Sequence, residues 1–456
     1  MQNIAYYKEH SAVDNIQQAI EKAKNLQNYN AILHLTEKRA LERAKLVDSG
    51  QITGRLKGVP FVVKDNFLAF DGPTTASSKM LEHFETPIQA EAVERLEAEG
   101  AICIGKANLD AFAHGGSTEN SAFGPTKNAI DQTKVAGGSS GGSAVSVALG
   151  IVPFALGSDT GGSIRQPASF NGVVGIKPTY GAVSRFGVVA MASSTDTIGC
   201  FATTASDTEL VMSVMSGLDT KDSTSRVDFW DKADDFTKKK VGIIKQFMDD
   251  GVEPEVKQSV IQYSEKLKRL GYDIEEVDLP LIKHSLAVYY IVVPAEVASN
   301  MARYDGVRYG HRSTGAKTLD ELYTFSRSEG LELENKRRIL IGNFVLSSGF
   351  FDDYYLRAQK VRTLLIQEFQ TAFQKYDLLL GPVSPTTAFG LGERVDDPIK
   401  MYLADILTTP ASLTGFPAIS VPNSFDNGGL PIGVQLISNY ETDKALLGVA
   451  SQAEAL

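Results

Sequence analysis

Two glycine-rich loops that carry serines bracket a short apolar segment, and this pattern restricts the fold more than any other feature. The first loop, GGSSGGS at 137–143, runs into the helical pattern Ala144–Leu149, and the second, TGGS at 160–163, follows the apolar run Val152–Leu156. Glycine is favoured where the backbone turns with a positive φ or closely approaches another segment. A short apolar run bounded by such turns is typical of a buried strand. The pattern predicts strand, loop and helix in layers.

Strand and helix patterns alternate along the rest of the chain. Further strands are expected at Pro60–Val63, Ala101–Ile104, Val241–Ile244, Tyr272–Val277, Leu378–Leu380, Ala418–Val421 and Ile432–Ile437, and helices at Ala90–Glu99 and Glu253–Leu270. Alternation of this kind is typical of an α/β fold whose strands are largely parallel.

Residues 1–456 are expected to form a single domain. Residues 1–50 form an N-terminal helical segment with helices at Val13–Gln27 and Asn30–Ser49, and residues 204–376 are richer in helix than the rest. We find no internal repeat, low-complexity linker or composition break that would separate domains. One α/β domain with a helix-rich excursion is therefore preferred over two domains.

Composition excludes several classes of protein. The 45 Lys and Arg against 55 Asp and Glu give a net charge of −10, which argues against nucleic-acid binding by this chain alone. Cys103 and Cys200 are too few for a disulfide framework or a zinc cluster, so no metal and no cofactor are expected in this chain. The start lacks a signal-peptide pattern, and the longest apolar stretch, Ala144–Leu156, is too short to span a bilayer. We expect a soluble, cytoplasmic protein without membrane contact.

Lys64 closes the apolar segment GVPFVVK and, with Ser139 and Ser163, indicates a hydrolase that needs no histidine. Serine is a poor nucleophile unless a base lies beside it. Lysine can be that base when burial keeps it neutral. The successive N–H groups of the TGGS loop form a nest that can hold an oxyanion. These residues predict a serine hydrolase that cleaves an amide bond.

The same loops leave other interpretations open. Either loop taken alone is compatible with a simple tight turn. GGSSG also fits the G-x-S-x-G nucleophile elbow of α/β-hydrolases, which requires a late catalytic histidine, and His284 or His311 would have to supply it. Nothing in the local sequence of either histidine marks that role. A phosphate-binding P-loop is disfavoured because neither loop ends in Gly-Lys-Ser/Thr.

The segments GVPFVVKDN, GGSSGGSA and GSDTGGSIRQPA resemble the amidase signature family over most of residues 55–200. The resemblance implies a large mixed, mostly parallel central sheet covered by helices on both faces. It also implies a Ser–cisSer–Lys triad made of Ser163, Ser139 and Lys64, with a non-prolyl cis peptide bond before Ser139.

In the mechanism that this resemblance implies, Ser163 attacks the amide carbonyl carbon while Ser139 relays the proton to neutral Lys64. The proton later returns to the leaving amine, and water hydrolyses the acyl-enzyme. The backbone N–H groups that hold the oxyanion are those of Thr160, Gly161 and Gly162. Because a free lysine has a pKa of about 10.4, the role of Lys64 requires a strongly depressed pKa.

Four further segments are similar to the A-subunit family of bacterial glutamyl-tRNA(Gln) amidotransferases: AFAHGGSTENSAFGPTKN, ASNMARYDGVRYG, NKRRILIGNFVLSSGFFDDYY and KMYLADILTTPASLTGFPAISVP. That family implies a glutaminase in a heterotrimer with B and C subunits. Ammonia from glutamine passes to a partner subunit, which uses ATP and Mg and makes most of the tRNA contacts. The partner converts Glu-tRNA(Gln) to Gln-tRNA(Gln) and, in some members, Asp-tRNA(Asn) to Asn-tRNA(Asn).

Two other functions stay open beside this interpretation. One is a stand-alone amidase that hydrolyses other carboxamides, and the other is a non-catalytic interaction protein. The chain ends at Leu456 within an expected helix, earlier than this family resemblance implies, so a shortened C-terminus is also open.

Glutamine recognition is assigned from the same resemblance and from the charges of glutamine. Its α-carboxylate calls for Arg338 in NKRRILIG, and its α-ammonium calls for Asp405 in MYLADILTTP. Tyr289 or Tyr290 in AVYYIVVPAE fits a hydrogen-bonding aromatic beside them. His114 stands where the family has methionine. It either lines the glutamine site, titrates near neutral pH, or forms the pocket wall without catalytic duty.

Overall fold

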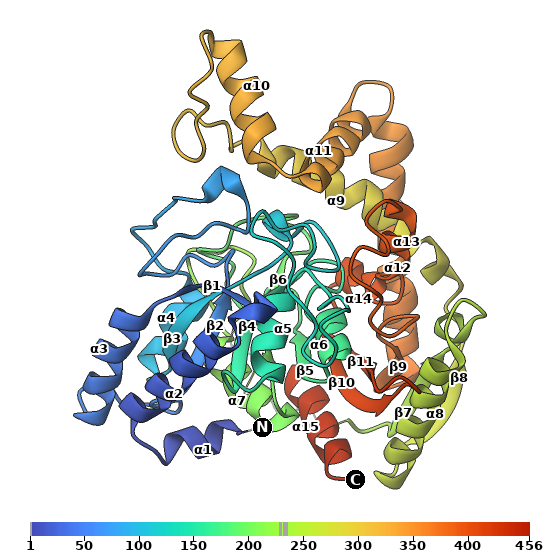
Figure 1. Ribbon diagram of the computed structural model, residues 1–456. Coiled ribbons are helices and arrows are strands. Elements are labelled where there is room, and N and C mark those ends of the chain that lie inside the picture. Colours follow the sequence, from blue (N-terminus) through green and yellow to red (C-terminus); the bar gives the residue numbers. More distant parts are fainter. Residues whose placement is uncertain (1, 228–229, 231–235) are drawn as a thin grey trace.

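One mixed sheet of eleven strands runs through the protein, whose computed structural model describes residues 2–227, 230 and 236–456 (Figure 1). The strands lie in the order β1-β3-β2-β4-β6-β5-β10-β11-β9-β7-β8. They are β1 (Ile32–Leu35), β2 (Pro60–Lys64), β3 (Ile102–Ala107), β4 (Phe154–Asp159), β5 (Val174–Lys177), β6 (Thr197–Ala202), β7 (Lys240–Ile244), β8 (Asp273–Val277), β9 (Leu378–Pro382), β10 (Ala418–Phe425) and β11 (Pro431–Ser438).

Helices surround this sheet and also form a lobe beside it. They are α1 (Ile4–Lys8), α2 (Ala12–Asn25), α3 (Glu37–Asp48), α4 (Glu91–Ala98), α5 (Gly141–Ala148), α6 (Arg165–Asn171), α7 (Ala205–Met215), α8 (Pro254–Arg269), α9 (Ser285–Met301), α10 (Leu319–Gly330), α11 (Leu333–Leu346), α12 (Arg357–Lys375), α13 (Pro398–Leu403), α14 (Thr409–Thr414) and α15 (Asp443–Glu454). Most strands and helices expected from the sequence are confirmed, with ends shifted by a few residues.

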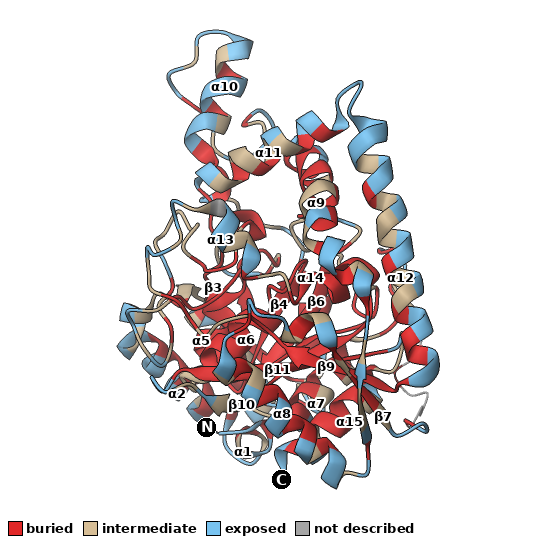
Figure 2. Cartoon of the chain, turned by 90° about the vertical axis from the view of Figure 1, so that its right-hand side faces the viewer, coloured by how far each residue is buried: buried red, intermediate tan, exposed pale blue. Residues whose placement is uncertain are grey.

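Alternate residues of the buried strands serve two separate cores, one on each face of the sheet. Along β2, Phe61 and Val63 pack in the core that includes residues of α4, α7, α8 and α15, whereas Val62 packs in the core with α2, α3 and α5. Helices on both faces are therefore confirmed. Because both faces are covered, the central strands β2, β4, β5 and β6 are fully buried, and the buried residues concentrate in the middle of the molecule (Figure 2).

The prediction of a mostly parallel sheet is wrong, although the mixed sheet is confirmed. Among the described residues, β2 pairs in parallel with β3 and β4, and β7 with β8 and β9, whereas the other six of the ten pairings are antiparallel. Residues 426–430 alone connect β10 to β11, and so short a connection permits only an antiparallel pair. Along the chain, strands and helices alternate as expected from β2 to β4 and from β7 to β9, but not in the segment between these two groups.

The second predicted N-terminal helix begins later than expected. Residues Ile32–Leu35 form β1, which pairs antiparallel with β3 at the edge of the sheet, and α3 begins only at Glu37. The four residues are half-buried, so their local pattern does not separate strand from helix. Pairing with β3 decides the conformation.

Helices α9, α10 and α11 and the start of α12 form the lobe, which Figures 1 and 2 show beyond the ends of the strands, whereas the end of α12 packs against the sheet through Phe369 and Phe373. Helix α9 packs against α11, α12 and α14. Among the described helices, the stretch Pro280–Met301 is long and apolar enough to cross a membrane by length and composition, and 56% of its most apolar window is buried inside the protein. This packing is that of an internal helix of the lobe.

Replacing Phe154 by alanine should test the core between β2 and β4. The Phe154 ring stacks on Phe61 with centroids 5.2 Å apart, and neither side chain is exposed. We expect Phe154→Ala to lower the free energy of unfolding by about 3–5 kcal/mol, measured by urea denaturation. Phe425→Ala, at a strand residue that is 68% exposed, is the control and should change it by less than about 0.5 kcal/mol. Equal effects of the two substitutions would contradict this packing.

Candidate functional site

Lys64 and Ser139 lie in direct contact inside the protein. Lys64 is the last residue of β2 and has no solvent exposure, and its Nζ lies 2.7 Å from Ser139 Oγ. Ser158 of β4 adds two contacts, because Nζ lies 2.9 Å from its Oγ and 3.3 Å from its carbonyl oxygen. Strands β2 and β4 are parallel neighbours, so both end at this edge of the sheet. Sequence reasoning missed Ser158, although its position in the GSDTGGS motif marks it as part of the same turn.

The surroundings of Lys64 favour its neutral form. Burial lowers the pKa of its amine from 10.5 to about 7, although the carboxylates of Asp110, Asp159 and Asp196 act in the opposite direction. A neutral amine in contact with a hydroxyl is able to accept its proton. The depressed pKa predicted from the sequence is therefore confirmed, and the catalytic role of Lys64 stays a prediction.

The backbone before Ser139 has the form that the family resemblance implies, because the peptide bond Gly138–Ser139 is cis. Asp110 braces this turn. Its backbone N–H donates to the Ser139 carbonyl oxygen at 3.2 Å, and its carboxylate accepts bonds from the N–H groups of Thr118 (2.9 Å) and Asn120 (3.0 Å). A side chain on Gly138 would place its Cβ 2.3 Å from Asp110 Oδ2, so only glycine fits there. Sequence reasoning missed Asp110 as well.

Ser163 lies against the same turn. The backbone N–H of Ser140 donates to the carbonyl oxygen of Ser163 at 3.2 Å, and this bond joins the two glycine loops. Ser163 is 8% exposed, and its hydroxyl makes no hydrogen bond to another described residue. The structure therefore brings Ser163 beside Ser139 through the backbone and leaves Ser163 Oγ without a protein partner.

Two of the three predicted oxyanion donors are available. The N–H groups of Thr160 and Gly161 make no hydrogen bond to another described residue. The Gly162 N–H differs, because it donates to Asp159 Oδ1 at 2.9 Å. Tyr289 closes the loop from the side, since a Cβ on Gly161 would lie 2.6 Å from the Tyr289 hydroxyl. An oxyanion at this loop would therefore meet Thr160 and Gly161 rather than Gly162.

A buried ion pair shapes the second glycine loop. Arg165 Nη2 lies 3.0 Å from Asp159 Oδ1, its Nε lies 3.1 Å from Oδ2, and neither side chain is exposed. Arg165 also donates to Gln435 Oε1 at 3.2 Å and to Ser412 Oγ at 2.8 Å, which ties α6 to β11 and α14. Breaking such a pair by removing one partner typically costs about 3–5 kcal/mol, because the other charge stays buried and unpaired. The loop that carries Ser163 is thereby held by its own acidic and basic residues.

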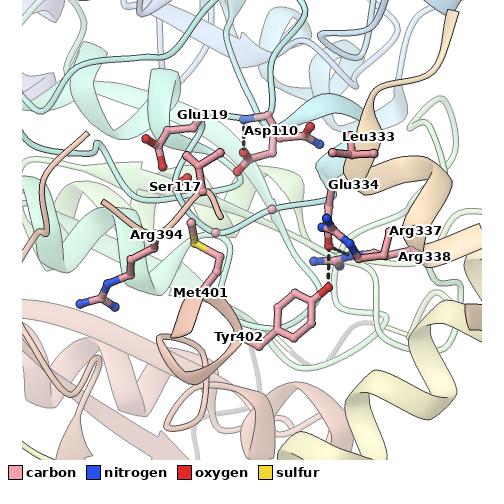
Figure 3. Close-up of a pocket in the computed structure, with 14 residues that line it drawn as sticks. Asp110, Ser117, Glu119, Leu333, Glu334, Arg337, Arg338, Arg394, Met401 and Tyr402 are labelled. Atoms are coloured by element: carbon pink, nitrogen blue, oxygen red, sulfur yellow. Dashed lines mark hydrogen bonds and ion pairs between the residues drawn. The ribbon is translucent and has the colours of Figure 1, made fainter. Parts of the chain in front are cut away.

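Arg338 of α11 lies at the wall of a cavity of about 160 Å³ (Figure 3). Its Nε donates to Glu334 Oε1 at 2.9 Å, and the Tyr402 hydroxyl donates to the same oxygen at 3.0 Å. Burial favours the neutral guanidinium, but Glu334 and the nearby tyrosines together outweigh it and raise the pKa of Arg338 well above its usual value. The Tyr290 ring lies 5.6 Å from Arg338 Cζ. The two Nη groups make no hydrogen bond to another described residue, so this side of the guanidinium can bind a carboxylate.

Asp405 lies beside a glycine that lines the same cavity. A Cβ on Gly116 would lie 3.4 Å from Asp405 Oδ2, and Asp405 Oδ1 accepts a hydrogen bond from Gln166 Nε2 at 3.4 Å. Desolvation raises the pKa of Asp405 to about 8, although Arg338 opposes this shift. A carboxyl group in this state ionises when a cation binds beside it. The structure therefore brings Asp405 and Arg338 to one cavity region.

His114 is fully buried behind the cavity wall. Its Nδ1 lies 2.5 Å from Asn335 Nδ2, and no described residue bonds its Nε2. Burial, with a smaller effect of Arg338, lowers the pKa of His114 well below 6.5. The interpretation that His114 titrates near neutral pH is therefore wrong, because the imidazole is neutral there.

Neither histidine that the α/β-hydrolase alternative requires reaches a glycine loop. His284 is exposed at the end of a short helix, Pro280–His284, and His311 Nε2 lies 2.7 Å from Glu329 Oε2. Ser139 Oγ contacts Lys64 instead. The structure does not support a histidine-dependent nucleophile elbow.

Comparison with known proteins agrees with this site. The model of the amidase family matches residues 14–447. The chain belongs to the amidase family. It is 48% identical over 456 residues to the glutamyl-tRNA(Gln) amidotransferase A subunit of Streptococcus suis, and this match covers 98% of the chain and 93% of the relative. The sequence resemblance to this family and to its A subunits is therefore confirmed.

Two further relatives point to the same branch of the amidase family. The glutamyl-tRNA(Gln) amidotransferase A subunit of Gloeobacter violaceus is 49% identical over 453 residues, or 97% of this chain and 93% of the relative. The crystal structure of the corresponding A subunit from Thermotoga maritima matches with a TM-score of 0.81 at 38% identity, and the match covers 98% of this chain and 93% of that one. The predicted fold class is thus shared with a solved member of the family.

In the described part of the chain, no group of three or more His, Cys, Asp or Glu side chains is placed to hold a metal ion. Cys103 and Cys200 are free and buried, and burial raises the pKa of Cys103 to about 11.

Replacing Lys64 by methionine should change how stability depends on pH. The lysine pKa is near 10.5 when unfolded and about 7 when folded, so between these values the unfolded chain binds a proton that the folded chain does not. This term stabilises the wild type as pH rises from 7 to 10, and Lys64→Met removes it. We expect the stability of the variant relative to the wild type to grow as pH falls from about 10 to 7, by about 3–4 kcal/mol.

Urea denaturation of both proteins at several pH values measures this difference, which does not depend on catalysis. Lys444→Met, at an exposed lysine of α15, is the control for the loss of a lysine as such. A stability difference between Lys64→Met and wild type that stays constant from pH 7 to 10 would show that Lys64 is charged in the folded protein.

Proposed function

We propose that this chain is the glutaminase subunit of a tRNA-dependent amidotransferase, which hydrolyses glutamine and supplies ammonia for the conversion of Glu-tRNA(Gln) to Gln-tRNA(Gln). The observation that carries the proposal is the 2.7 Å contact between Ser139 Oγ and a lysine amine whose pKa is about 7. Near-full-length similarity to glutamyl-tRNA(Gln) amidotransferase A subunits supports the substrate assignment.

In the proposed reaction, Ser163 Oγ attacks the side-chain carbonyl carbon of glutamine. Its proton passes to Ser139 Oγ as the Ser139 proton passes to Lys64, so the amine becomes an ammonium ion. The N–H groups of Thr160 and Gly161 stabilise the oxyanion, each worth about 2.7–4 kcal/mol where such donors have been removed. Return of the proton through Ser139 releases ammonia, and water then cleaves the ester to give glutamate.

Recognition of glutamine is proposed to use both of its charged ends. The Arg338 Nη groups bind the α-carboxylate, and Asp405 binds the α-ammonium, which keeps Asp405 ionised. Tyr289 lies against the oxyanion loop, and the hydroxyl of Tyr290 is buried without a described partner, so both suit a hydrogen bond to the substrate. His114 is proposed as part of the same glutamine site.

The proposal also covers the proteins with which this chain acts. We propose that residues 1–456 act as one domain, whose excursion 204–376 contributes Tyr289, Tyr290 and Arg338, in a cytoplasmic heterotrimer with B and C subunits. The partner subunit uses ATP and Mg, makes most of the tRNA contacts and receives the ammonia. The same proposal includes conversion of Asp-tRNA(Asn) to Asn-tRNA(Asn) by this complex.

Co-expression with the B and C subunits tests the assignment. The complex should co-purify, and its release of glutamate from glutamine should rise when Glu-tRNA(Gln) and ATP are added. A chain that hydrolyses simple carboxamides alone, and that gains nothing from the partner subunits, would instead be a stand-alone amidase. Absence of both activities would favour an interaction protein.

The rate at saturating glutamine should fall in acid. Because Lys64 acts as a base only when neutral, we expect kcat to decrease about tenfold per pH unit below an apparent pKa of about 7. The ionisation of Asp405 influences substrate binding, so it should not change kcat at saturating glutamine. Glutamate release by the complex from pH 5.5 to 8.5 measures it, and a kcat that stays constant down to pH 5.5 would exclude the general-base role.

Replacing Arg338 by methionine should affect glutamine more than a glutamine analogue without the α-carboxylate. Loss of a hydrogen-bonded charge pair to this carboxylate should raise KM for glutamine about tenfold to a hundredfold. The decarboxylated analogue 4-aminobutanamide should show little change. Arg357→Met, at an arginine of α12 whose side chain is 74% exposed, is the control. Equal loss for both substrates in Arg338→Met would remove the carboxylate-binding role.

A further inference from the structure

His114 and Asn335 meet between the two segments that line the glutamine cavity. His114 precedes Gly115 and Gly116, which form one wall, and Asn335 lies between Glu334 and Arg338 on α11, which form another. Both side chains are fully buried. Asn335 and Arg338 are three residues apart on the helix, so they share one face.

The contact fixes which nitrogen of His114 carries the proton. Asn335 Nδ2 donates to the Ala111 carbonyl oxygen at 2.9 Å, which identifies this atom as the amide nitrogen, and it lies 2.5 Å from His114 Nδ1. An amide N–H can only donate, so Nδ1 is the acceptor and the proton sits on Nε2. The buried imidazole is neutral, so it has this one N–H group to offer.

The Nε2–H group is a buried donor that no described residue accepts from. Leaving such a group unpaired is costly, so an acceptor is expected beside Nε2. The guanidinium of Arg338 is close enough to influence the ionisation of His114. A substrate carboxylate bound by Arg338 would therefore bring acceptor oxygens to the neighbourhood of His114.

We propose that His114 Nε2–H donates a second hydrogen bond to the α-carboxylate of glutamine held by Arg338, and that Asn335 is the positioning residue that keeps the proton on Nε2. The inference rests on the proposed glutaminase function and deepens it. A neutral donor at this position would distinguish a substrate with an α-carboxylate from one without it.

The test compares glutamine with 4-aminobutanamide in the complex with B and C subunits. His114→Met should raise KM for glutamine about tenfold or more, leave kcat within about threefold and change KM for the analogue far less. His114→Gln, whose side-chain amide can place an N–H near the position of Nε2, should recover most of the affinity for glutamine. His284→Met, at an exposed histidine, controls for the substitution itself.

The positioning role of Asn335 is tested by combining its substitution with that of His114. Asn335→Leu should also raise KM for glutamine, because the imidazole proton is no longer held on Nε2. In the His114→Met background the same substitution should have almost no further effect on KM. A purely structural role of Asn335 would instead give independent, additive losses.

The outcomes separate this inference from the function on which it rests. If the wild-type complex does not hydrolyse glutamine, the proposed function fails. If it does, but His114→Met changes KM for glutamine and 4-aminobutanamide equally, the donor role of His114 is excluded and a trapped water or wall residue remains. Failure of His114→Gln to recover glutamine affinity while its melting temperature equals that of the wild type would also overturn the proposal.

Discussion

A lysine amine enclosed without solvent exposure is the constraint around which this site is built. The last residue of β2 ends between β3 and β4, and burial there makes the charged form of Lys64 unfavourable. Ser139 and Ser158 supply the only polar contacts of the amine that the structure describes. One buried amine therefore lies at the strand ends beside two serine hydroxyls, and its desolvation lowers the stability of the folded state at neutral pH.

The glycine loops around this lysine are held by buried carboxylates rather than by apolar packing. Asp110 accepts two backbone N–H groups beside the cis bond at Gly138–Ser139, and Asp159 does the same for the Ser163 loop while it pairs with Arg165. The same carboxylates oppose the loss of the Lys64 proton. The depressed pKa is the balance of these two effects, and desolvation is the larger.

The helical lobe carries several residues proposed to bind glutamine, whereas the loops at the strand ends carry the serines proposed to react. Arg338 and Asn335 lie on α11, and Tyr289 and Tyr290 lie on α9, which packs against α11. Glu334 and Tyr402 orient the guanidinium of Arg338 by one edge and leave the other edge unpaired. His114 contacts Asn335 of the lobe but lies outside it, in the segment that follows β3.

The sequence by itself determined the fold class, the family and the residues of the Lys64, Ser139 and Ser163 motif, because short apolar runs and glycine spacing act over a few residues. It did not determine strand direction at the centre of the sheet, the strand Ile32–Leu35, or the engagement of the Gly162 N–H by Asp159. It also gave no sign of Glu334 or Asn335 as partners of the site residues, and Ser158 was missed although it lies in the GSDTGGS motif. Those outcomes depend on pairing and hydrogen bonds between segments far apart in the chain, and only the tertiary structure brings such segments into contact.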